Sequence, residues 1–456
     1  MRVAVVGTGY LGAVQAACLA RCGHEVHGID IDAERVAALC SGRAPFCEPG
    51  LDDLLAAGLE QGLLTFGTDP AAVAHADVVL LCVGTPQRAG SRAADLSHLQ
   101  AALVAIAPHL RDGATVVGKS TVPVGTSSWL ISLLDDLTPA GVAVRLGWNP
   151  EFLREGFAVQ DTLTPDRIVL GAADDATLLE MERLWAPVLA PGVPVVRTDL
   201  ATAELAKVSA NVMLAARISV VNSLAEVCEA AGADIGDLVA SLGHDPRIGP
   251  HVLSPGLGFG GGCLPKDLRA FAARAVELGV TAPVPLLDAV DAVNMHQRSR
   301  TVDLVLSALG EPGARGTVAV LGGAFKAGSD DVRDSPALDV AATLAACGAT
   351  VQLYDPQAGP GVARTRPELT VVDDAASACK GASVVLMATD WPEFAVLDPA
   401  DLADVVERPV VVDARLVLDV QRWRAAGWTV HALGRGPARE ADESAGPMDP
   451  GGSTPA

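Results

Sequence analysis

The chain has 456 residues, of which half are hydrophobic and 19% are charged, a composition typical of a globular protein of two or three domains. Acidic residues outnumber Lys and Arg by 55 to 33, which gives a net charge of −22. A field this negative repels nucleic acids and anionic membranes, so we expect neither as a partner.

The sequence indicates a reducing compartment. No apolar run reaches the roughly 18–20 residues that cross a bilayer, and Met1 leads directly into an apolar strand without a signal-peptide cleavage site. The nine cysteines are scattered and form no CxxC pair, which predicts neither a disulfide framework nor a metal site. We therefore expect a cytoplasmic protein.

Predicted strands and helices alternate in the first part of the chain. Short apolar runs bounded by turn residues lie at 2–7, 24–30, 76–84, 114–118, 144–148 and 167–171. Such runs are typical of buried parallel strands in a doubly wound sheet. We predict a Rossmann-like, dinucleotide-binding domain over residues 1–198.

From residue 199 to 300 the pattern is helical. Residues 202–231 have apolar side chains at helical spacing and contain neither Gly nor Pro, which predicts one long helix. Further helices are predicted at 267–279 and 285–309. An all-helical segment between two sheets often buries apolar surface against a second subunit, so we expect a homodimer through this central domain.

Strands return in the last part of the chain, at 316–325, 350–356, 382–389 and 409–415. They predict a second, smaller Rossmann-like domain over residues 301–434. Residues 435–456 are rich in Pro, Gly, Ser and acids without an apolar pattern, which predicts a disordered tail. The predicted fold class is therefore α/β, with two doubly wound domains joined by a helical region.

A glycine-rich turn follows the first strand and opens a helix. Gly7 allows the tight turn, Gly9 lets the backbone approach a pyrophosphate, and Gly12 allows close helix packing. Asp30 ends the next strand and can accept ribose hydroxyls, which favours NAD, while the nearby Arg35 leaves NADP open. The predicted contacts are Gly7, Gly9, Tyr10, Leu11, Gly12, Asp30 and Arg35; the alternative is a strand–helix turn without ligand.

Three further loops follow apolar strands, at the sheet edge where ligands bind. Thr85 with Pro86, and the STVPVGT segment at 120–126, offer hydroxyls and amides to the cofactor, although ordinary loop chemistry explains them as well. If the NPEFLREG segment at 149–156 begins a helical turn, its two glutamates share a face and can divide acid and base roles. The alternative is a solvated helix start.

Lysine is rare in this chain, which uses arginine for most of its basic residues. The five lysines are Lys119, Lys207, Lys266, Lys326 and Lys380, and four of them lie in or directly beside the motifs described here. Lys207 and Asn211 are four residues apart on the long helix, so a cation and an amide share one face and can stabilise an oxyanion. The alternative is a lysine that extends along the helix surface to solvent.

The most specific segment is GLGFGGGCLPKD at 256–267. Five glycines surround Cys263 and let a substrate approach the backbone, and Lys266 and Asp267 follow at a helix start. A thiol beside a cation and a helix start is a candidate nucleophile of low pKa, and Asp267 can accept or relay its proton. The alternative is an inert structural cysteine.

Basic residues also follow the first strand of the last domain. Lys326 and Arg333 stand close after this strand and suit phosphate binding. Solvated surface charge is the alternative.

Together these motifs, in this order, resemble the UDP-glucose/GDP-mannose dehydrogenase family, the NAD-dependent nucleotide-sugar 6-dehydrogenases. The resemblance runs from Met1 to about Arg415. It implies an N-terminal domain that binds NAD, a C-terminal domain that binds the nucleotide sugar, and a long central helix that builds the dimer.

The resemblance also implies residue roles. Cys263 would be the nucleophile, Lys207 and Asn211 would hold the oxyanion, Glu151 would be the base, and Asp267 with Thr121 would place a water. The further cofactor contacts implied are Thr85, Pro86, Thr121, Glu155, Lys266 and Arg333. The substrate contacts implied are Glu151, Phe152, Leu153, Arg154, Glu155, Lys207, Asn211, Phe259, Gly260, Lys326, Arg415 and, from the neighbouring subunit, Arg247.

The implied reaction is a four-electron oxidation of a sugar alcohol to a carboxylate through a thiohemiacetal and a thioester on the cysteine. The glycine-rich loop resembles the bacterial UDP-glucose branch, which favours UDP-glucose, while GDP-mannose or a UDP-N-acetylhexosamine stays open. Two alternatives belong to other classes of protein: a two-electron hydroxyacid dehydrogenase, which needs no such cysteine, and a nucleotide-sugar sensor without activity.

Overall fold

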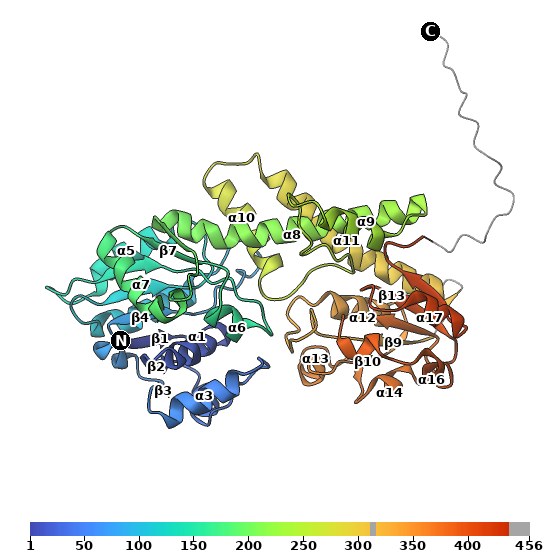
Figure 1. Cartoon of the computed structure of the whole chain (residues 1–456), viewed down its shortest axis with the longest axis horizontal. Helices are drawn as coiled ribbons and strands as arrows, with labels where there is room; N and C mark the ends of the chain where they lie inside the picture. The colour runs from blue at the N-terminus through green and yellow to red at the C-terminus, as the bar shows by residue number, and fades with distance from the viewer. Residues whose placement is uncertain (311–315, 437–456) are drawn as a thin grey trace, which may run out of the picture.

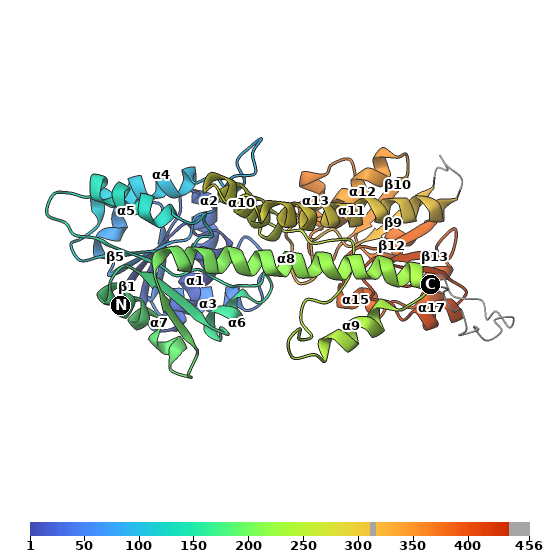
Figure 2. The same ribbon diagram turned by 90° about the horizontal axis from the view of Figure 1, so that it is seen from above.

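The computed structural model describes residues 1–310 and 316–436. Two sheets lie at opposite ends of the molecule, and the long helix α8 (Leu200–Ala231) runs from one to the other (Figure 1). Figure 2 shows α8 from above, alongside α10 and α11. The predicted α/β architecture is confirmed. The predicted tail lies outside the described residues from residue 437 onward.

The first sheet has eight strands in the order β3-β2-β1-β4-β5-β6-β7-β8. These are β1 (Arg2–Val6), β2 (Glu25–Ile29), β3 (Leu64–Gly67), β4 (Val78–Leu81), β5 (Thr115–Gly118), β6 (Arg145–Trp148), β7 (Ile168–Ala172) and β8 (Val195–Thr198). The α-helices between them are α1 (Tyr10–Arg21), α2 (Ala33–Cys40), α3 (Leu51–Glu60), α4 (Ser97–Ile106), α5 (Thr126–Leu137), α6 (Ala158–Leu163) and α7 (Asp175–Leu189).

The prediction that all these strands are parallel is wrong for β7, which pairs antiparallel with β6. A parallel partner would need a crossover of a dozen or more residues that covers a face of the sheet, usually as a helix. Here the connection runs as irregular chain until the short helix α6, which is six residues long. An apolar run shows that a strand is buried but does not show its direction, so no local pattern indicates this reversal.

The central segment contains α8, α9 (Ile235–Gly243), α10 (Leu264–Glu277) and α11 (Val284–Leu309). Helix α8 begins after Asp199, whose carboxylate accepts a hydrogen bond from the Thr202 amide, and ends at Gly232 in the left-handed conformation (φ +71°). Helix α11 continues to Leu309, so the predicted boundary at residue 300 falls inside a helix.

By length and composition alone, α8 is also long and apolar enough to cross a membrane, with a mean hydropathy of 1.3 over 18 residues. Part of α8 is buried against α10 and α11 and carries polar groups such as Glu204 and Lys207. A core helix of a soluble protein passes the same test.

The last sheet has six parallel strands in the order β11-β10-β9-β12-β13-β14. These are β9 (Thr317–Leu321), β10 (Thr350–Tyr354), β11 (Thr370–Val371), β12 (Val384–Met387), β13 (Val410–Asp413) and β14 (Thr429–Ala432). The helices are α12 (Pro336–Ala346), α13 (Gly359–Thr365), α14 (Ala375–Cys379), α15 (Pro392–Ala395), α16 (Pro399–Ala403) and α17 (Val420–Ala425). The loop after β9 reaches the first domain, where the Lys326 ammonium donates to the backbone oxygen of Glu155.

Candidate active site

The turn between β1 and α1 has the shape of a phosphate cradle. Gly7 has φ +87°, and a Cβ on Gly12 would lie 1.8 Å from the Gly7 oxygen, so neither position accepts a side chain. Helix α1 begins at Tyr10 with no side-chain cap, which leaves its first amides free for an anion. These residues fit the pyrophosphate of NAD.

Asp30, at the end of β2, stands beside this turn. Its carboxylate accepts from the Thr8 amide at 2.7 Å and from the Arg35 guanidinium at 2.9 Å. Arg35 also pairs with Asp32 at 3.2 Å. The cation that could have bound the 2′-phosphate of NADP is therefore neutralised by two carboxylates. An acid at this position suits ribose hydroxyls and repels a 2′-phosphate.

A buried carboxylate that the sequence did not reveal fixes the next part of the site. Glu48 bonds to the Tyr10 hydroxyl and accepts from the amides of Gly156, at 2.8 Å, and Val159, at 3.2 Å. It therefore ties the start of α1 to the loop that follows Glu155. Nothing in its local sequence indicates partners more than 100 residues away.

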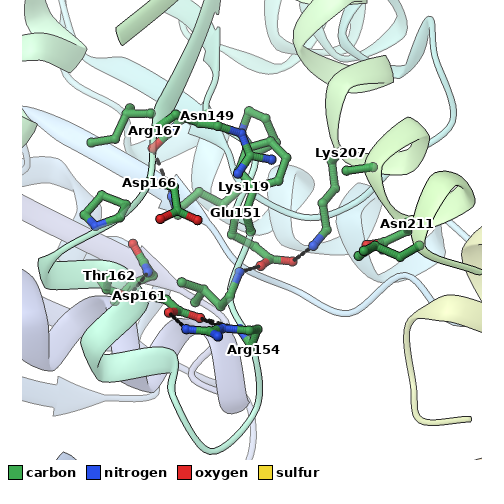
Figure 3. A pocket seen from close by; sticks show the side chains of 18 of the residues that line it. Lys119, Asn149, Glu151, Arg154, Asp161, Thr162, Asp166, Arg167, Lys207 and Asn211 are labelled. Atoms are coloured by element: carbon green, nitrogen blue, oxygen red, sulfur yellow. Dashed lines mark hydrogen bonds and ion pairs between the residues drawn. The ribbon is translucent and has the colours of Figure 1, made fainter. Parts of the chain in front are cut away.

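The segment after β6 does not form the conditional helical turn, because residues 151–154 are irregular. Glu151 turns toward α8, where its Oε1 lies 3.0 Å from the Lys207 ammonium, and its Oε2 accepts from the Leu153 amide at 2.6 Å (Figure 3). Glu155 turns toward the last domain instead, so the expectation that the two glutamates share a face is wrong.

Lys207 and Asn211 lie on one buried face of α8, as predicted, with exposures of 5% and 6%. Asn211 donates to Asp267 at 2.6 Å, and Asp267 also accepts from Lys266 at 2.5 Å. Burial lowers the pKa of Lys207, but Glu151 and Cys263 raise that pKa by more, so the ammonium is held charged. Two cation–carboxylate pairs thus come together from α8, α10 and the loop after β6.

Cys263 caps the N-terminus of α10 and is exposed to solvent on one side. The protein packed around its thiol destabilises the thiolate, and Glu151 and Asp267 repel it, which together raise the thiol pKa to about 12. Lys207 and Lys266 lower that pKa by less. The predicted low pKa of this thiol is therefore wrong, because burial and two carboxylates outweigh two lysines.

The glycine-rich loop is held from both sides. Asn294 on α11 accepts from the Phe259 amide at 2.7 Å and donates to its oxygen at 3.0 Å. A Cβ on Gly260 would lie 2.2 Å from the backbone oxygen of Asp334, and one on Gly262 would lie 2.5 Å from the Arg333 guanidinium carbon. The glycines therefore let the loop pack against the last domain.

Charged side chains join the first and last domains beside this loop. Glu155 accepts from the Ser329 hydroxyl at 3.0 Å and lies 3.4 Å from Arg333. Arg333 is held mainly by Asp331, at 2.6 Å. Arg415 donates to the Gly258 oxygen at 3.3 Å. From the last domain, Lys326 and Arg333 thus contact the first domain, and Arg415 contacts the glycine-rich loop.

The loop that holds Thr121 lies between the first domain and α10. The Thr85 hydroxyl donates to the Thr121 oxygen at 2.7 Å, and Thr121 faces Lys266 and Asp267 across a narrow gap. Glu204 on α8, which sequence reasoning missed, accepts from two amides at the far end of this loop, at 2.6 and 2.7 Å. Pro86 continues from Thr85 at the same sheet edge.

A cavity of about 830 Å³ opens beside this cluster (Figure 3). Its walls include Glu151, Lys207 and Asn211, while Cys263 lies outside its lining. Phe152 and Leu153 also face it, and the Arg167 guanidinium stacks 3.7 Å from the centre of the Phe152 ring. The cavity combines an apolar floor with charged groups of both signs.

Two predicted substrate contacts are not drawn into the cluster. Arg247 is 87% exposed and pairs with Asp245 next to it. Arg154 reaches the cavity but is largely exposed and pairs with Asp161 at 2.7 Å. Within residues 1–310 and 316–436, no group of three His, Cys, Asp or Glu residues could hold a metal ion.

Comparisons with known proteins agree with this arrangement. Three models of one family, UDP-glucose/GDP-mannose dehydrogenase, match the chain: the NAD binding domain over residues 1–189, the central domain over 201–296 and the UDP binding domain over 319–420. UDP-glucose 6-dehydrogenase TuaD of Bacillus subtilis is 37% identical over 445 residues, which covers 97% of this chain and 95% of that protein.

Solved structures of nucleotide-sugar dehydrogenases match nearly the whole chain. A UDP-glucose dehydrogenase from Pyrobaculum islandicum is similar with a TM-score of 0.87 and 35% identity, over 96% of this chain and 98% of that one. A UDP-D-ManNAc dehydrogenase from Pyrococcus horikoshii reaches a TM-score of 0.85 at 27% identity, over 96% and 100% of the two chains.

Proposed function

This chain belongs to the UDP-glucose/GDP-mannose dehydrogenase family, and from that membership we propose that it oxidises UDP-glucose to UDP-glucuronate in a four-electron reaction. It is an NAD-dependent oxidoreductase, and NAD supplies the hydride acceptor for both oxidations. The turn at Gly7–Gly12 and the Asp30 carboxylate would hold this cofactor. The observation that carries the proposal is the meeting of Cys263 with two lysine–carboxylate pairs at the junction of the domains.

Glu151 is the base that receives the proton of the C6 hydroxyl in the first oxidation. Its Oε1 lies 3.0 Å from the Lys207 ammonium, a contact that holds the carboxylate beside α8. The sulfur of Cys263 then bonds to the aldehyde carbon as a thiohemiacetal, and the second oxidation converts this adduct into a thioester. The covalent bond keeps the aldehyde from leaving between the two oxidations.

The tetrahedral species formed on Cys263 carry a developing oxyanion. Lys207 and Asn211 are buried donors on one helix face beside the thiol, and donors fixed in a dry site stabilise such charge by about 2.7–4 kcal/mol each. Asp267 and Thr121 face each other across a narrow gap, from which they can orient the water that releases the carboxylate. Hydrolysis of the thioester regenerates the thiol.

A homodimer through α8 is part of the proposal. Met213, Val220 and Val227 recur at intervals of seven residues and are 71%, 59% and 64% exposed. Side chains seven apart lie on one helix face, so they form an apolar stripe that a second copy can cover. Sedimentation of Val220→Glu against wild type tests this, and a dimer of unchanged stability would contradict it. All nine cysteines are free, which supports a reducing, cytoplasmic location.

A substrate screen tests the function. The purified protein is mixed with NAD and UDP-glucose, GDP-mannose or a UDP-N-acetylhexosamine, while absorbance follows the reduced cofactor and mass spectrometry follows the sugar acid. We expect UDP-glucose to be preferred and two reduced cofactors to form per acid. One reduced cofactor per sugar would support a two-electron dehydrogenase instead. Preference for GDP-mannose or a UDP-N-acetylhexosamine would contradict the proposed substrate and place the chain in another substrate class of the family.

Cys263→Ser tests the covalent route, because a serine hydroxyl does not form the thioester. We expect the variant to lose acid production while NAD still binds. Normal acid production by this variant would refute the proposed mechanism.

A further inference from the structure

A charged group that the proposed mechanism does not use is buried in the wall of the same cavity. Lys119 directly follows β5 and is 3% exposed. Its ammonium donates to Asn149 Oδ1 at 2.9 Å and lies 4.9 Å from the centre of the Trp185 ring. Figure 3 shows Lys119 beside Asn149 at the back of the cavity.

No carboxylate accepts a hydrogen bond from this ammonium within the part of the chain that the structure describes. A buried cation with only neutral partners is costly, and an apolar side chain of the same length would pack there without that cost. Burial lowers the pKa of Lys119 to about 8, which expresses the same cost. A lysine at this position therefore serves something other than stability.

Asn149 is two residues before Glu151 in the chain and is held on three sides. Its Oδ1 accepts from Lys119 and, at 2.8 Å, from the Trp185 indole, and its Nδ2 donates to the Val169 oxygen on β7 at 2.8 Å. The irregular segment that carries Glu151 starts at this fixed point. Lys119 thus sets where that segment leaves the sheet.

The charge of Lys119 also reaches Glu151. The titratable groups that act on the ammonium are Cys82 after β4, Glu151 after β6 and Lys207 on α8, while α7 contributes the neutral Trp185 ring. Of these, Glu151 is attracted to the ammonium and Lys207 is repelled by it. Removing the cation therefore removes an electrostatic attraction on the Glu151 carboxylate.

We propose that Lys119 is a positioning residue for Glu151, which it acts on through Asn149 and through its positive charge. The proposal rests on the proposed function, in which Glu151 is the base. Wild-type turnover of UDP-glucose tests that function in the same assay, so the two ideas fail separately.

The test compares Lys119→Met, which removes the charge and the donor, with Lys119→Gln, which can still donate to Asn149 but is neutral. Lys380→Met is the matched control, because Lys380 is exposed on the last domain. We expect Lys119→Met to bind NAD and to melt no lower than wild type, to lose at least tenfold in kcat, and to move the acidic limb of the kcat–pH profile to higher pH. Lys119→Gln should keep the shifted limb but recover part of kcat.

A folded Lys119→Met variant with wild-type kcat and an unmoved pH profile would overturn the proposal. If Lys119→Met does not fold, Asn149→Asp decides, because it gives the ammonium a carboxylate partner and screens its charge without removing the lysine. This variant should also move the acidic limb to higher pH, and an unchanged profile would equally overturn the proposal.

Discussion

Glu155 gives the sharpest test of the contact between the first and last domains. Its side chain is 15% exposed and lies among Ser329, Arg333 and Asp331. Its pKa is raised from 4.5 to about 7, mainly by burial and then by repulsion from Asp331, while Arg333 and Ser329 lower it by less. The unfolded chain keeps the ordinary value, so folding and proton binding are linked at this residue.

The sign and size of the effect follow from this linkage. Between pH 4.5 and about 7 the folded protein holds a proton that the unfolded chain has released, so stability falls as the pH rises through this window. At about 1.4 kcal/mol per pH unit the loss over this window is at most about 3.5 kcal/mol, and it is complete above pH 7. Glu155→Gln resembles the protonated form and should escape the loss.

Thermal unfolding of wild type and Glu155→Gln from pH 5 to pH 8 measures this. We expect equal stability at pH 5 and a variant that is more stable by about 1–3 kcal/mol at pH 8, a rise of several degrees in Tm for a cooperative unit of this size. Glu368→Gln removes an exposed glutamate of the last domain, which lies 3.8 Å from Arg366, and serves as control. A gap between Glu155→Gln and wild type that is the same at both pH values, or a less stable variant at pH 8, would refute the reasoning.

Two further predictions concern the packing of a glycine on β5 and the loop that holds Thr121. Gly118→Ala would place a Cβ 2.2 Å from the buried Trp148 ring, and we expect it to lower the free energy of unfolding by about 1–3 kcal/mol. Gly84→Ala is the control: no atom lies within 4 Å of its Cβ, so thermal unfolding should show a loss of less than about 1 kcal/mol. Glu204→Gln gives up one of the two amide hydrogen bonds to the loop that holds Thr121. We expect it to raise KM for NAD several-fold in steady-state assays; a change in kcat alone would contradict a role in placing this loop.

The fold was predictable where the signal is local. Continuous apolar runs identified most buried strands, and the helical spacing of residues 202–231 located α8 within two residues of its start. The direction of β7 was not predictable, because a buried strand has the same composition in either direction. Helix geometry is equally local, so Lys207 and Asn211 lie on one face as the interval of four residues requires.

The site residues that sequence reasoning missed or misplaced depend on distant partners. Glu48 bonds to the Gly156 amide across 108 residues, and Glu151 pairs with Lys207 on α8, across the boundary between the first and central domains. These contacts hold residues 151–154 out of a helix, which no local pattern indicates. Lys119 stood out only as a rare residue type, and its partner Trp185 is remote in the sequence.

The raised pKa of Cys263 also bears on the order of events in the proposed reaction. Among the charges that act on the thiol, Glu151 raises its pKa most, and Lys207 opposes it. When Glu151 takes the proton of the substrate hydroxyl, it becomes neutral, which removes the strongest repulsion and leaves Lys207 without its partner. Both changes lower the pKa of the thiol at the moment when the aldehyde has formed. The site would thus keep the sulfur protonated while the alcohol is bound and ionise it when a carbon that it can attack is present.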